Sequence, residues 1–89
     1  MARLIVFTSH AWADYTYWQS QDKKTLKRIN ALIEGAAREP FTGIGKPEAL
    51  RGDLTGFYSR RIDDANRLVY QASDTELQII ACRYHYSDK

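Results

Sequence analysis

Residues 57–86 have the sequence FYSRRIDDANRLVYQASDTELQIIACRYHY, and this stretch decides the fold class. Three runs within it are rich in β-branched and aromatic side chains, which is typical of strands. Polar residues at 63–66 and 73–75 separate the runs and favour hairpin turns. The expected strands are residues 57–62, 67–72 and 76–86. We therefore expect an antiparallel meander in this half of the chain.

The pairing of the last two expected strands decides which side chains share a face of the sheet. If Ala72 pairs with Glu76, then Arg67 lies on the same face as Arg83 and His85, because side chains alternate along a strand. A shift of one residue moves Arg67 to the other face. The alternation of residue types leaves both registers open.

One strand and one short helix are expected at the N-terminal side of this meander. Residues 3–8 form a β-branched and aromatic run, and Thr8 or Ser9 can cap a helix that extends to about Gln19. Three aromatic residues recur on this helix at helical spacing, and we expect the two tryptophan rings to be buried in the core or in an interface. These aromatic residues are Trp12, Tyr15 and Trp18.

A second, longer helix is expected after Asp22, whose carboxylate can cap it. Its apolar residues repeat on one face, and Pro40 ends it, since the residue before a proline avoids helical dihedral angles. Residues 41–47 then form a loop. The element order β-α-α-β-β-β predicts a single α+β domain over residues 1–89, with two N-terminal helices packed on an antiparallel sheet.

Composition narrows the class of protein and its location. Apolar residues make up 44% of the chain and charged residues 27%, with a formal net charge of +2. These values are typical of a globular protein, and no run approaches the length of a membrane-spanning helix. Cys82 is the only cysteine, so an internal disulfide is excluded. We expect Cys82 to be a small core residue, and we expect the protein to reside in the reducing cytoplasm.

The last expected strand ends in Arg83-Tyr84-His85-Tyr86, which places an imidazole beside two phenols and a guanidinium. Histidine titrates near cellular pH, arginine suits phosphate, and aromatic rings stack on unpaired bases. Together with acidic and basic residues upstream, this group could supply a base, an acid and a cationic clamp. That set is the minimum for cleaving RNA without a metal, and no metal-ligand spacing or cofactor motif occurs in the sequence.

A plainer interpretation exists for each of these residues. Glu48 after Lys-Pro is typical of a solvated loop. Arg61 and Arg67 flank a hairpin, where they can form surface ion pairs with Asp63 or Asp64. Such pairs contribute only about 0 to 1 kcal/mol.

Five segments follow one another along nearly the whole chain: Trp12-Ala13-Asp14-Tyr15-Thr16-Tyr17-Trp18-Gln19, Gly45-Lys46-Pro47-Glu48-Ala49-Leu50, Gly56-Phe57-Tyr58-Ser59-Arg60-Arg61-Ile62, Arg67-Leu68-Val69-Tyr70 and Ala81-Cys82-Arg83-Tyr84-His85-Tyr86. In this order they resemble the YoeB-type toxins of the RelE/ParE superfamily of bacterial toxin–antitoxin modules.

The resemblance implies a RelE-like microbial ribonuclease fold and metal-independent cleavage of mRNA in the ribosomal A site. The family's general base falls on Glu48, its phosphate-stabilising arginine on Arg67, its general acid on His85 and its terminal tyrosine on Tyr86. Further basic positions match Lys46 and Arg61, and we add Arg51 as a candidate substrate contact. This chain departs from the family pattern by continuing through Ser87-Asp88-Lys89.

The resemblance also implies a YefM-like antitoxin whose flexible tail wraps the toxin, besides the ribosome and mRNA as partners. The aromatic residues of the first helix lead us to expect a homodimer. Two other functions stay open. ParE-like members share the fold and poison DNA gyrase without this acid–base set, and a plain RNA-binding module would use the basic and aromatic residues for affinity alone.

Overall fold

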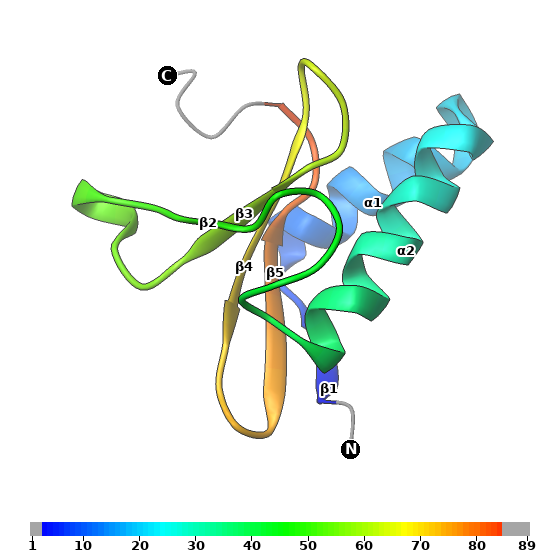
Figure 1. Ribbon diagram of the computed structural model, residues 1–89. Coiled ribbons are helices and arrows are strands. Elements are labelled where there is room, and N and C mark those ends of the chain that lie inside the picture. The colour runs from blue at the N-terminus through cyan, green and yellow to red at the C-terminus, as the bar shows by residue number, and fades with distance from the viewer. Residues whose placement is uncertain (1–2, 85–89) are drawn as a thin grey trace.

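Two helices cover one face of a five-stranded sheet in the computed structural model, which describes residues 3–84 (Figure 1). The expected α+β class and the order of the main elements are confirmed. The short strand β2 and the 3₁₀ helix η1 are additional to the expected elements. The elements are β1 (Leu4–Phe7), α1 (Ser9–Gln21), α2 (Lys23–Arg38), β2 (Glu48–Ala49), η1 (Gly52–Leu54), β3 (Tyr58–Arg61), β4 (Arg67–Ala72) and β5 (Glu76–Ala81).

The sheet is mixed, so the expectation of an antiparallel sheet is wrong for one pair of strands. The strand order is β1-β5-β4-β3-β2, and β1 runs parallel to β5 while the other neighbours are antiparallel. The amides of Leu4 and Thr8 donate to the carbonyls of Thr75 and Ile79, at 2.9 and 3.1 Å. Residue propensities predict a strand but not its direction, which is set here by pairing with a distant segment.

The β4–β5 register differs by one residue from the pairing of Ala72 with Glu76. Ala72 pairs with Leu77, because the amide of Ser73 donates to the carbonyl of Glu76. The loop of this hairpin therefore contains two residues, Asp74 and Thr75, instead of the expected three. An irregularity at Val69 and Tyr70 shifts the register by one more residue toward the end of β5. β5 itself ends at Ala81, earlier than expected.

Both helices begin at the caps that the sequence indicates. The side chain of Thr8 accepts from the amide of Ala11, and the carboxylate of Asp22 accepts from the amides of Lys24 and Thr25. A further hydrogen bond from the Thr25 hydroxyl is the largest of the effects that lower the pKa of Asp22. Each cap satisfies amides that would otherwise lack partners in the first turn.

The core lies between α2 and the sheet. The apolar stripe of α2 is buried, as expected, against the helix-facing side chains of the strands. Trp18 and Cys82 are also buried, and the Trp18 Nε1–H donates to the Cys82 carbonyl at 2.8 Å. Trp12 is 52% exposed and lies outside the core, so of the two expected places only an interface remains for its ring. Its ring lies beside Phe7 and Tyr15, near the sheet edge formed by β1. The buried stripe comprises Ile29, Leu32, Ile33, Ala36 and Ala37.

Neither helix in the part of the chain from residue 3 to 84 is long and apolar enough to cross a membrane.

The burial of Cys82 predicts an unreactive thiol. Burial, with a smaller contribution from Asp14, raises the pKa of Cys82 from 9.0 to about 12. Because the thiolate is the nucleophile, we expect native protein at pH 8 to react with iodoacetamide roughly 1,000-fold more slowly than the urea-unfolded chain. The measurement is the rate of mass gain with and without urea, and similar rates in both states would contradict the burial of this side chain.

Candidate functional site

The sheet face opposite the helices collects three of the residues singled out from the sequence. Glu48 pairs with Ser59, Ser59 pairs with Val69, and Arg61 pairs with Arg67. Residues directly opposite each other in neighbouring strands project from the same face, and so do residues two apart along a strand. These five side chains therefore share one face, which we call the open face.

The two arginines of the open face lie at the β3–β4 hairpin. Arg61 forms an ion pair with Asp64, and Arg67 Nη1 donates to the carbonyls of Asp63 and Asn66 at 2.6 and 3.1 Å. The Asp64 side chain is 93% exposed. Water screens such a pair, so it contributes about 0 to 1 kcal/mol and leaves Arg61 available to a stronger anion such as phosphate.

Glu48 is exposed on the two-residue strand β2. Lys46, two residues earlier, has a left-handed backbone with φ of 52° and an exposed side chain. Arg51 is exposed and lies at the start of η1. Lys46 and Arg51 thus lie in loops at the two ends of β2, outside the paired strands that bring Glu48, Arg61 and Arg67 together.

The chain reaches its last described residue beside the start of β4. The amide of Tyr84 donates to Asn66 Oδ1 at 2.6 Å, and the carbonyl of Tyr84 accepts from the Arg67 amide at 3.0 Å. The Arg83 guanidinium lies 3.5 Å from the ring centre of Tyr17. The predicted site residues His85 and Tyr86, and the extension 87–89, lie outside the described residues.

A buried clamp that the sequence interpretation missed fixes the segment before Tyr84. The Cys82 amide donates to Asp14 Oδ2 at 3.0 Å, and the Cys82 carbonyl accepts from Trp18. Asp14 is 7% exposed, and His10 Nε2 lies 3.6 Å from its Oδ2 atom. The four-residue spacing of Asp14 and Trp18 places both on one face of α1, which is the signal that indicates a shared role.

Arg60 is a second residue whose role the sequence did not reveal. It follows Ser59 and precedes Arg61 on β3, so its side chain lies on the helix-facing side of the sheet, where it is fully buried. Its guanidinium donates to Tyr70 and to three backbone carbonyls. The alternation of side chains along β3 therefore places the cation of Arg60 in the core and that of Arg61 on the open face.

An apolar hollow of about 470 Å³ has Val69 of the open face in its lining. Val69, Ile80 and Leu54 form much of its apolar wall, while Arg83 and Tyr84 also line it. An apolar surface beside cations suits a base attached to a phosphate.

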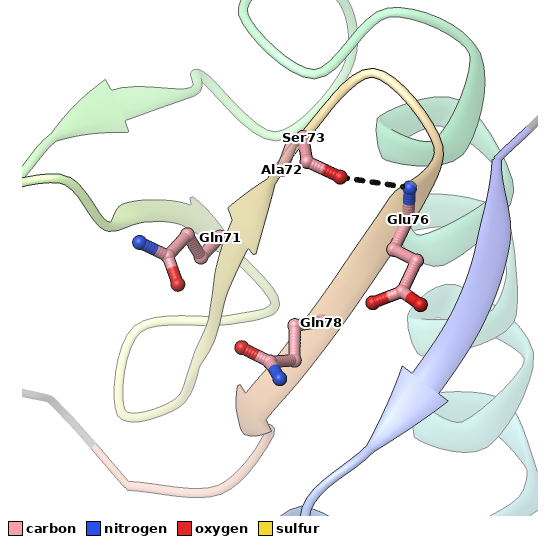
Figure 2. Close-up of a pocket in the computed structure, with 5 residues that line it drawn as sticks. All are labelled: Gln71, Ala72, Ser73, Glu76 and Gln78. Atoms are coloured by element: carbon pink, nitrogen blue, oxygen red, sulfur yellow. Dashed lines mark hydrogen bonds between the residues drawn. The ribbon is translucent and has the colours of Figure 1, made fainter.

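A second hollow, of about 340 Å³, lies near the β4–β5 turn (Figure 2). Gln71 and Gln78 line it from neighbouring strands, and the Glu76 amide donates to the Ser73 hydroxyl at 3.0 Å (Figure 2). Among the described residues, its lining carries one carboxylate and no cation, which does not suit a polyanion. Of the predicted site residues within 3–84, none lines it.

The described residues 3–84 contain no group of three or more His, Cys, Asp or Glu side chains that could hold a metal ion. The open face instead offers a carboxylate and two guanidinium groups, which suit proton transfer and the binding of phosphate.

Comparisons of sequence and of fold relate this chain to known proteins. A family model described as "YoeB-like toxin of bacterial type II toxin-antitoxin system" matches residues 7–86. Toxin YoeB of Streptomyces coelicolor is 58% identical over 82 residues, which cover 92% of this chain and 98% of that protein.

Two solved structures from Staphylococcus aureus are similar over nearly their full length. The YoeB dimer matches with a TM-score of 0.89 and 46% identity, covering 97% of this chain and 100% of that chain. YoeB in a heterotetrameric YoeB–YefM toxin–antitoxin complex matches with a TM-score of 0.86 and 49% identity, covering 96% and 100%. By sequence and by fold, this chain belongs to the YoeB-like toxins of bacterial type II toxin–antitoxin systems.

Proposed function

We propose that this toxin is a ribosome-dependent endoribonuclease that cleaves mRNA in the A site without a metal and thereby stops translation in the cytoplasm. The observation that carries the proposal is the gathering of Glu48, Arg61 and Arg67 on the open face. Neighbouring strands lie about 4.8 Å apart, so β2 and β4 are separated by roughly 10 Å. A ribose and its phosphate fit between the Glu48 side chain on β2 and the Arg67 side chain on β4.

RNA supplies its own nucleophile, the 2′-hydroxyl next to the scissile phosphate. Glu48 removes its proton, and the resulting oxygen attacks phosphorus to form a 2′,3′-cyclic phosphate. Arg67, with Arg61 and Lys46, stabilises the charge that develops on the phosphoryl oxygens, since fixed cations act most strongly where charge appears in the transition state. Arg51 adds a contact to the RNA backbone.

His85 donates a proton to the departing 5′ oxygen in this proposal, and Tyr86 is the aromatic member of the site. The support from the described residues is the anchoring of Tyr84, which directly precedes His85 in sequence. Both backbone polar groups of Tyr84 are bonded at the start of β4, one of them to Arg67.

A YefM-like antitoxin is the partner that we propose for the toxin, because a relative from Staphylococcus aureus is known in complex with YefM. The cations of the open face suit an acidic tail that orders on binding. We also propose a homodimer, as in the YoeB dimer of Staphylococcus aureus. Trp12, Tyr15 and Phe7 form a partly exposed aromatic cluster that suits the contact between subunits.

We expect expression of this chain alone to arrest growth, and co-expression of its antitoxin to restore it. The measurement is colony formation after induction, with Glu48→Gln as the matched control that should grow normally. Message cleavage during the arrest distinguishes the nuclease from a ParE-like toxin, which would leave messages intact and damage DNA. Normal growth on strong expression of folded protein would contradict the toxic activity.

Trp12→Ala should weaken the dimer by about 100-fold, since large aromatic residues often dominate interface energies. Light scattering across a concentration series measures the change. The control is Phe41→Ala, which removes another exposed aromatic ring, remote in sequence from α1. A wild-type protein that stays monomeric at high micromolar concentration would exclude the homodimer.

Glu48→Gln and His85→Gln should each slow cleavage by roughly 100- to 10,000-fold, the usual effect of losing a positioned base or acid. Arg67→Ala should cost a similar factor because the transition-state charge loses its partner. Ribosome binding should persist in all three variants, since many phosphate contacts share that affinity. The assay is single-turnover cleavage of ribosome-bound message, with product ends identified by mass spectrometry.

Two results would contradict this mechanism. One is a 3′-hydroxyl on the upstream product in place of the cyclic phosphate. The other is a wild-type cleavage rate for both Glu48→Gln and His85→Gln, which would favour a binding module. Replacing magnesium by cobalt hexammine keeps the ribosome intact while testing the need for a metal with exchangeable ligands.

A further inference from the structure

Arg60 is fully buried, and its guanidinium gathers acceptors from separate parts of the chain. Nε donates to the Tyr70 hydroxyl at 3.0 Å, and Nη1 donates to the Ile44 carbonyl at 2.9 Å. Nη2 donates to the carbonyls of Glu39 and Thr42, at 2.6 and 2.8 Å. Three of the four acceptors are backbone carbonyls between residues 39 and 44, so one side chain holds this loop.

The charge of Arg60 is matched by dipoles. Among residues 3–84, no acidic side chain forms an ion pair with it. Glu39, whose carbonyl it binds, is the C-terminal cap of α2, and the negative end of the helix dipole lies there. The Tyr70 hydroxyl in turn donates to the Pro40 carbonyl at 2.5 Å, which adds a fourth loop residue to the same network.

The loop leads directly to Lys46 and Glu48. The Gly45 carbonyl accepts from the Arg61 amide at 2.7 Å. A Cβ atom on Gly45 would lie 2.6 Å from the Leu32 side chain and 3.0 Å from Arg60 Cβ, so the loop packs tightly against Leu32 and the base of the Arg60 side chain. β2, which carries Glu48, is only two residues long and supplies few hydrogen bonds of its own.

We propose that Arg60 is a positioning residue for the catalytic base. From the helix-facing side of the sheet it fixes the loop of residues 39–45, and it thereby sets where Lys46 and Glu48 lie. The proposal rests on the proposed nuclease function. Alternation on β3 directs Arg61 toward the substrate and Arg60 toward the support of the site. Lysine cannot replace this planar fork, because one ammonium group cannot reach acceptors on several sides.

The test compares Arg60→Lys and Tyr70→Phe with the wild-type toxin in the single-turnover ribosome assay. Tyr70→Phe removes only the hydroxyl between Arg60 and Pro40, so it keeps the inference testable if Arg60→Lys does not fold. We expect cleavage to slow by roughly 10- to 100-fold in Arg60→Lys, and by a smaller factor in Tyr70→Phe, because a small displacement of a catalytic group has effects of this size. Ribosome affinity should change less than about threefold, since phosphate contacts elsewhere are intact.

Two readouts separate positioning from a loss of stability. Amide hydrogen exchange at residues 44–49 should accelerate in both variants while β4 and β5 stay protected. In a Glu48→Gln background, Arg60→Lys should slow cleavage by less than about threefold more, because residues that act through one another are not additive. Arg38→Lys, the same substitution at an exposed position in the last turn of α2, is the matched control and should cleave at the wild-type rate.

The outcomes distinguish this inference from the proposed function. A wild-type cleavage rate in Glu48→Gln would show that Glu48 is not the general base, and the proposed nuclease mechanism would then fail. A slow Glu48→Gln combined with wild-type cleavage by folded Arg60→Lys and Tyr70→Phe would overturn the positioning role alone. Fully additive effects of Arg60→Lys and Glu48→Gln would also overturn it.

Discussion

The buried guanidinium of Arg60 constrains much of this structure, because a desolvated cation must have its donors satisfied. Its acceptors come from the end of α2, from the following loop and from β4, so the helix, the loop and the sheet are fixed by one group. Burial raises the pKa of Tyr70, which keeps its hydroxyl protonated and able to donate onward to Pro40. The helix dipole stabilises a cation at this end by about 0.3 to 1 kcal/mol, and up to about 2 kcal/mol in a buried geometry.

The sheet separates stability from chemistry by the alternation of its strands. One face carries Leu68, Tyr70 and Ile79 into the core. The opposite face carries Glu48, Arg61 and Arg67, whose charges stay in contact with solvent. A substitution of one of these three charged residues therefore removes a functional group with little loss of packing, whereas a substitution on the helix-facing side disturbs the elements that hold the site.

Local signals predicted the elements well, and long-range constraints explain the rest. The caps at Thr8 and Asp22 and the two hairpins depend on neighbouring residues, so the sequence shows them directly. The parallel direction of β1, the one-residue shift at Ala72 and the exposure of Trp12 depend on contacts between distant segments. The candidate site followed the same division. Family resemblance indicated Glu48, Arg61 and Arg67. It did not indicate that Arg60 is buried, and arginine side chains in proteins are mostly exposed, so nothing in the sequence separated Arg60 from Arg61.

The parallel pairing of β1 with β5 also sets the order in which this chain can fold. Leu4 pairs with Glu76, so the first strand waits for a partner that is synthesised 72 residues later (76 − 4). Closing so long a loop costs entropy before the contacts repay it, and topologies with many long-range pairings fold more slowly than those with local contacts. The clamp on Cys82 by Asp14 and Trp18 spans a similar separation. A nascent chain on the ribosome thus lacks the complete sheet until β5 has been synthesised.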